Sequence, residues 1–128
     1  RDEHQQMRKQ IEDLESKLLD YEAAQFPLKN GVAVGSFKNR GIERLKLLAI
    51  KICSKPGAVA LLADEGDQLR IVFARSGDAT VDVSRLLKTT LEKFGGRGGG
   101  RPNLAQGGGL TAETPEAVLN FAFDHLLD

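Results

Sequence analysis

The sequence predicts an α/β fold in which a small mixed β-sheet with helices on it follows an N-terminal coiled-coil helix. Three observations indicate this architecture. Residues 1–28 repeat apolar side chains at spacings of four and three. Residues 29–128 alternate short apolar runs with amphipathic patterns in the order β-α-β-β-α-β-α. Residues 95–109 hold eight of the fourteen glycines. We therefore expect a dimerisation helix over 1–28 and one globular domain over 29–128.

The first expected element is a charged helix that carries a narrow apolar seam. The seam consists of Met7, Ile11, Leu14, Leu18 and Tyr21. Pro27 and the Asn30-Gly31 turn signal end the helix. Such a seam predicts a homodimer or, as an equal alternative, one half of a helical hairpin whose other half lies upstream. Because the chain begins at Arg1 rather than methionine, we expect it to be part of a larger protein.

The globular part is expected to begin with a strand over residues 32–37. Gly41 then opens a helix, and Pro56-Gly57 stops it. Two apolar runs, 58–63 and 69–74, are separated by turn-forming residues and predict a hairpin. Both runs are apolar on both faces, which predicts helices on each side of the sheet.

The last elements are predicted from their helix caps. A helix over 86–94 would be capped by Asp82 or Ser84 and stopped by Gly95. The glycine-rich segment is expected to follow as a loop, with a short strand over 104–106. Thr114 and Pro115 then form an N-cap and first helical position for the final helix.

The net charge is zero, but the charges are strongly segregated along the chain. Residues 29–56 carry seven basic and one acidic side chain, and residues 85–101 carry five and one. The acidic excess lies in the remaining segments. If folding joins the two basic segments, one face of the domain becomes positive, as a nucleic-acid partner would require. The basic residues are Lys29, Lys38, Arg40, Arg44, Lys46, Lys51 and Lys55 in the first segment and Arg85, Lys88, Lys93, Arg97 and Arg101 in the second.

Several classes of function lack support in the composition. A lone cysteine, Cys53, rules out an intrachain disulfide and favours a cytoplasmic setting. No stretch is apolar enough to span a membrane, and the N-terminus is not signal-like. His4 and His125 are too isolated for metal ligation or general-base catalysis. We therefore expect no catalytic residues, no metal site and no cofactor in this fragment.

The glycine-rich segment, GGRGGGRPNLAQGGG, is the strongest candidate for a binding site. Glycines allow close approach of backbone amides to an anion, and Arg97 and Arg101 supply the charge. Asn103 and Gln106 offer donors and acceptors for a ligand or for the loop's own backbone. The segment lacks the lysine of a Walker loop and the strand context of a dinucleotide fingerprint. The full candidate set in this segment is Arg97, Gly98, Gly99, Gly100, Arg101, Asn103 and Gln106. Lys38 and Arg40 are the next candidates for RNA contact, and the alternative is that they are solvated surface residues without a partner.

This segment, preceded by VDVSRLLKTTLEKF, resembles the C-terminal (C-Ala, DHH-associated type) domain of alanyl-tRNA synthetases and of long alanyl-tRNA editing proteins. The resemblance covers about residues 29–128, and the N-terminal seam is similar to the coiled coil that precedes this domain in the family. It implies a non-catalytic module that docks on the corner of tRNA, with alanine tRNA as the expected partner. The parent would be an alanine-tRNA ligase or an alanyl-tRNA deacylase.

Two other interpretations stay open at this stage. The domain could be the substrate-binding part of a DHH phosphoesterase, although Arg101 stands where the GGGH motif of that superfamily has histidine. Alternatively, the chain could be a protein-interaction module in which the seam makes a dimer and the glycines only pack against a helix.

Overall fold

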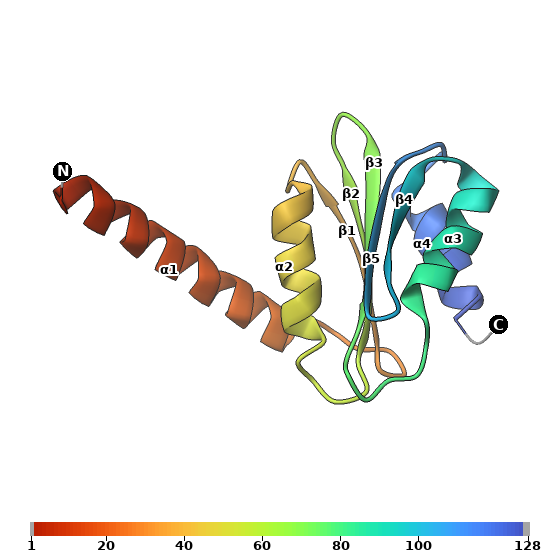
Figure 1. Cartoon of the computed structure of the whole chain (residues 1–128), viewed down its shortest axis with the longest axis horizontal. Helices are drawn as coiled ribbons and strands as arrows, with labels where there is room; N and C mark the ends of the chain where they lie inside the picture. Colours follow the sequence, from red (N-terminus) through yellow and green to blue (C-terminus); the bar gives the residue numbers. More distant parts are fainter. Residues whose placement is uncertain (1, 127–128) are drawn as a thin grey trace.

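The computed structural model describes residues 2–126 and, within them, four helices and five strands (Figure 1). In chain order these are α1 (Asp2–Gln25), β1 (Val32–Lys38), α2 (Ile42–Ile52), β2 (Val59–Glu65), β3 (Leu69–Arg75), α3 (Val83–Phe94), β4 (Arg97–Arg101), β5 (Leu104–Leu110) and α4 (Pro115–Asp124). The predicted α/β class is confirmed.

The five strands form one mixed sheet in the order β1-β2-β3-β5-β4. β1 and β2 are parallel and are joined through α2, whereas every other neighbouring pair is antiparallel. Consequently β1 and β4 are the two edges of the sheet. The first basic segment therefore begins at the β1 edge, whereas the second begins in α3 and ends in the β4 edge.

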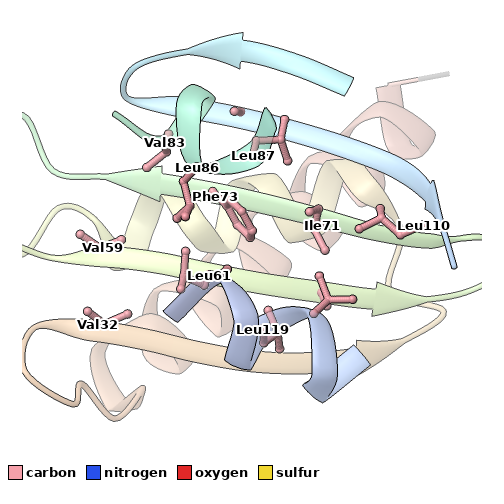
Figure 2. Packing of buried hydrophobic residues seen from close by; sticks show 14 residues of the cluster. Val32, Val59, Leu61, Ile71, Phe73, Val83, Leu86, Leu87, Leu110 and Leu119 are labelled. Atoms are coloured by element: carbon pink, nitrogen blue, oxygen red, sulfur yellow. The ribbon is translucent and has the colours of Figure 1, made fainter. Parts of the chain in front are cut away.

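Helices cover both faces of the sheet, as the uniformly apolar central strands predict. α2 packs on one face with Ala60, Leu62 and Val72, and α3 and α4 pack on the other (Figure 1). On the face covered by α3 and α4, Phe73 is fully buried and packs in one cluster with Leu61 and Ile71 (Figure 2). Because α2 contacts β2 and β3, the β5–β4 edge of its face is left uncovered.

The expected helix caps are present. The Asp82 carboxylate accepts hydrogen bonds from the backbone N–H groups of Ser84 and Arg85 at the start of α3. The Thr114 hydroxyl accepts from the N–H of Ala117, with Pro115 in the first position of α4. Asp82 thus marks the start of α3, and Gly95, whose N–H donates to the carbonyl oxygen of Leu91 at 2.7 Å, ends the helix where the glycine-rich segment starts.

The short strand expected over 104–106 is confirmed as part of β5, but the prediction that the rest of the glycine-rich segment is a loop is wrong. Arg97–Arg101 and Leu104–Leu110 are antiparallel strands joined at Pro102 and Asn103. Glycine has low strand propensity, so no local signal predicts β4. The strand forms because β5 pairs with β3 and offers its other edge to the chain.

The N-terminal half of helix α1 projects away from the sheet, and its C-terminal half contacts α2 (Figure 1). At the C-terminal end of α1, Ala23 is buried, and Leu19 and Phe26 pack beside it in the same layer as α2. The predicted seam faces solvent: its five side chains, Met7, Ile11, Leu14, Leu18 and Tyr21, are between 54% and 68% exposed. No helix within residues 2–126 is both long and apolar enough to cross a membrane.

Candidate nucleic-acid interface

The β4–β5 hairpin carries the glycine-rich segment at the free edge of the sheet. All five residues of β4 are exposed. β4 pairs with β5 so that Arg97 lies opposite Gly108 and Arg101 opposite Leu104. The two arginines are thus at the two ends of an exposed edge strand. Neither guanidinium has a hydrogen-bond or ion-pair partner among the side chains and backbone of residues 2–126.

Two of the three β4 glycines are required by the close approach of the hairpin strands. A Cβ at Gly98 would lie 2.3 Å from the carbonyl oxygen of Gln106, and one at Gly100 would lie 2.4 Å from that of Leu104. Between them, a Cβ at Gly99 would meet nothing within 4 Å. Gly98 and Gly100 therefore maintain the hairpin, and Gly99 leaves open space above it.

The tip of the hairpin is fastened to β3 and α3. Arg75 Nε donates to the carbonyl oxygen of Pro102 at 3.0 Å, and the Arg75 N–H donates to that of Asn103 at 3.1 Å. The N–H of Val83 also donates to the Pro102 carbonyl, at 3.0 Å. The Arg75 guanidinium further donates to the carbonyl of Ala79. Arg75 is therefore a structural residue of the turn rather than a free cation.

A shallow hollow of about 300 Å³ lies on the α2 side of the hairpin. It brings together five predicted site residues, Gly99, Gly100, Arg101, Asn103 and Gln106. The amides of Asn103 and Gln106 make no side-chain hydrogen bond within the described chain, so they are available to a ligand. The hollow is lined by Lys46, Gly99, Gly100, Arg101, Asn103, Leu104, Ala105 and Gln106.

Lys46 is a residue that the sequence did not single out. It belongs to α2, about fifty residues before the hairpin, and is half-buried at the rim of the hollow. Its signal in the sequence is only that it is one of seven basic residues. Because β5 lies between β3 and β4, the sheet order brings this helix beside the glycine-rich edge.

Lys38 and Arg40 lie elsewhere. Lys38 ends β1, at the opposite edge of the sheet. Arg40 donates to both carboxylate oxygens of Glu22, at 2.7 and 2.9 Å, and its guanidinium lies 4.1 Å from the ring centre of Phe37. The structure therefore does not bring these two candidates to the hairpin.

Most of the first basic segment instead holds α1 on the domain. Arg44 pairs with Glu15 at 3.2 Å, and Lys51 pairs with Asp20. Lys55 donates to the carbonyls of Ala23 and Ala24, at 3.1 and 3.2 Å, near the C-terminal end of α1. We call this set of polar contacts, together with the Arg40–Glu22 pair, the α1–α2 latch. The two basic segments therefore do not merge into one positive face, and only Lys46 of the first reaches the hollow.

The remaining candidates for chemistry are structural. Burial raises the pKa of the Cys53 thiol to about 11. His125 stacks on Phe121 with ring centres 4.0 Å apart, and its Nδ1 lies 2.8 Å from the Phe121 carbonyl oxygen. The side chain of His4 lies outside the described part of the chain. Within that part, His, Cys, Asp and Glu side chains form no cluster of three that would hold a metal ion.

Comparison with known proteins gives a consistent result. The DHHA1 domain model matches residues 29–126. An alanine–tRNA ligase of Methanospirillum hungatei is 33% identical over 84% of this chain and 12% of its own length. The alanyl-tRNA editing protein AlaX-L of Pyrococcus horikoshii is 29% identical over 91% of this chain and 29% of its own length. The chain spans only 8% of the alanine–tRNA ligase of Methanoregula boonei.

Solved structures show the same fold. The C-Ala domain of the Aquifex aeolicus alanyl-tRNA synthetase superposes with a TM-score of 0.68 at 25% identity, over 76% of this chain and 91% of that domain. A DHH-domain member of the s1p family of ribosomal proteins superposes with a TM-score of 0.61 at 16% identity, over 97% of this chain and 33% of its own.

Proposed function

This chain belongs to the DHHA1 domain family, and we propose that it is the C-Ala-type tRNA-binding and oligomerisation module of an alanyl-tRNA synthetase or of an alanyl-tRNA editing protein. In this proposal the module itself is non-catalytic and needs no cofactor. It would act in the cytoplasm, where it would support aminoacylation or editing by other parts of its parent protein.

The observation that carries the RNA-binding proposal is the exposed hairpin with two unpaired arginines. An arginine without an internal partner loses no salt bridge when it meets a phosphate, and it releases counterions from the RNA. Asn103 and Gln106 in the adjacent hollow have the donors and acceptors needed for a ribose 2′-hydroxyl or a base edge. The site therefore suits a folded RNA that presents both phosphates and nucleosides, such as tRNA.

Titration of the chain with an alanine tRNA transcript over a range of salt concentrations tests this proposal. Each lost phosphate contact reduces the slope of log affinity against log salt by somewhat less than one, so Arg97→Ala with Arg101→Ala should remove up to about two units. The matched control is Lys88→Ala with Lys93→Ala, which removes two exposed cations from α3. An unchanged slope for the arginine pair, or no binding of the unmodified chain at low salt, would falsify the proposal.

The oligomerisation part of the proposal rests on the exposed seam of α1. Five apolar side chains form one exposed stripe on a projecting helix. Such a stripe is typical of a coiled-coil surface without its partner. We propose that a second copy covers it. Analytical ultracentrifugation should find a dimer that Leu14→Asp with Leu18→Asp converts to a monomer, while Lys9→Glu leaves it unchanged. A monomer for the unmodified chain would contradict self-association.

A further inference from the structure

We infer that Lys46 and Arg70 belong to the same RNA-binding surface as Arg97 and Arg101, so that the RNA backbone crosses the hairpin on its α2 side. This inference rests on the proposed tRNA-binding function and assigns it a face and two further residues. Neither residue stands out in the sequence, because each lies at least 25 positions before the glycine-rich segment and belongs to another element.

The strand register places Arg70 in line with Arg97. Arg70 of β3 lies opposite Gly108 of β5, and Gly108 lies opposite Arg97 of β4. Residues that lie opposite one another on neighbouring strands form a row, and the side chains of one row lie on the same side of the sheet. With neighbouring strands about 4.8 Å apart, the two arginine Cα atoms lie about 10 Å apart across one glycine.

The next two rows complete an open platform on that side. Gln106 lies between Val72 and Gly99, and Leu104 lies between Ala74 and Arg101. Val72 and Ala74 are buried in the α2 layer, which fixes the side of the sheet to which the rows belong. Positive side chains therefore stand at the ends of the platform, and an amide stands at its centre.

Glycines keep the space above this platform open. A Cβ at Gly108 would lie 3.3 Å from Cγ of Arg70, which shows that the Arg70 side chain runs alongside this glycine. A Cβ at Gly99 would meet nothing within 4 Å. A larger side chain at either position would separate the cations or fill the hollow.

Lys46 borders the platform from α2. It lines the hollow together with Arg101 and Gln106. Its neighbours Arg44 and Lys51 pair with carboxylates of α1, whereas the ammonium of Lys46 and the guanidinium of Arg70 have no such partner in the described chain. Both cations are therefore available to an external anion.

The opposite side of the hairpin is closed at the same level. A Cβ at Gly107 would lie 3.2 Å from Cδ2 of Leu91 and 3.4 Å from Cδ1 of Leu87, so α3 packs directly against β5 there. Lys88 and Lys93 are exposed on α3, on that other side. They mark the alternative path for the RNA.

Four variants distinguish the two paths, with alanine tRNA transcript as the probe. Lys46→Ala and Arg70→Ala should each flatten the log affinity against log salt slope by up to about 0.9 and weaken binding by about threefold to tenfold at low salt. Gly99→Leu should weaken binding by filling the hollow. Lys88→Ala with Lys93→Ala should leave both quantities unchanged. Thermal unfolding of each variant checks the fold, and Lys46→Gln and Arg70→Gln serve if an alanine variant unfolds.

The outcomes separate this inference from the proposed function. If Arg97→Ala with Arg101→Ala reduces the slope but folded Lys46 and Arg70 variants bind as the unmodified chain does, the inference is overturned and tRNA binding stands. A loss of slope with the α3 lysines instead would place the RNA on the other side and also overturn it. If the Arg97 and Arg101 pair has no effect, the proposed binding site itself is wrong.

Discussion

The two basic segments of this chain differ in whether their cations are paired inside the structure. In residues 29–56, Arg40, Arg44, Lys51 and Lys55 are engaged by the side chains or carbonyls of α1. In residues 85–101, Arg97 and Arg101 extend from an edge strand without a partner in the described chain. Basic residues thus form internal contacts in the first segment and remain available on an open surface in the second.

The difference shows that a count of basic residues does not identify a ligand site. Residues 1–28 carry an acidic excess of three and residues 29–56 a basic excess of six, and the structure joins those two segments. Within residues 2–126, no ion pair joins the second basic segment to an acidic side chain. Whether a cation is already paired decides whether it contributes to binding, because breaking an internal pair offsets the gain from a new one.

The largest expected effect is on the hairpin. Gly100→Val would force a Cβ against the backbone of β5 and should lower the free energy of unfolding by about 2 kcal/mol or more. Gly99→Val is the matched control, because its Cβ enters open space and should change stability by less than about 0.5 kcal/mol. Chemical denaturation measures both. Equal losses would show that the close approach does not decide which glycines are required.

The next effect concerns the apolar contact beneath the α1–α2 latch. Ala23→Asp would bury a carboxylate between α1 and α2 and should cost about 2 kcal/mol of stability. Ala24→Asp, one residue along and exposed, is the matched control. Hydrogen exchange over residues 19–26 should rise only in the first variant.

Cys53 gives a second readout of the same change. It lies in the same buried layer as Ala23, and burial raises its pKa to about 11. Thiol labelling at pH 8 should therefore be slow in the unmodified chain and faster when Ala23→Asp frees α1. If labelling is equally fast in all three proteins, α1 does not protect this layer.

A smaller effect is expected from the ion pairs of the latch. Arg44→Ala with Lys51→Ala should cost about 0.5 kcal/mol per pair, since each pair has one side chain that is at least 60% exposed. The same variant should leave the salt dependence of tRNA binding unchanged, in contrast to Arg97→Ala with Arg101→Ala. A reduced slope would mean that the latch cations also meet RNA, and the contrast between the two segments would fail.

The smallest effect is on the cap of α3, the helix that supports the hairpin. Hydrogen bonds from the Ser84 hydroxyl and the Arg85 N–H hold the pKa of Asp82 below its usual 3.8. A lowered pKa means that this cap stabilises the fold fully above about pH 4 and is lost as pH falls through the folded pKa. The melting temperature should therefore drop less between pH 7 and pH 3 in Asp82→Ala than in the unmodified chain. Parallel curves would contradict this role of Asp82.

The sequence predicts the periodic elements well and the site only in part. Helix spacing, the Thr114-Pro115 start and the two-sided apolar strands depend on local rules, so the class and element order could be predicted. The strand at Arg97–Arg101 could not, because three glycines carry no strand signal and only pairing with β5 defines it. The latch and the position of Lys46 beside the hairpin likewise depend on sheet order, which local patterns do not encode.

The charged ends of β4 also bear on aggregation. An open sheet edge can recruit a strand from another molecule, and natural proteins discourage this with short edge strands and charges. β4 has five residues, three of which lack side chains to interlock with a new neighbour, and an arginine stands at each end. If two copies met along this edge, their arginines would repel each other, and five strand residues with three glycines would offer too few side-chain contacts to offset that repulsion. The same residues that leave this backbone accessible therefore also disfavour assembly through it.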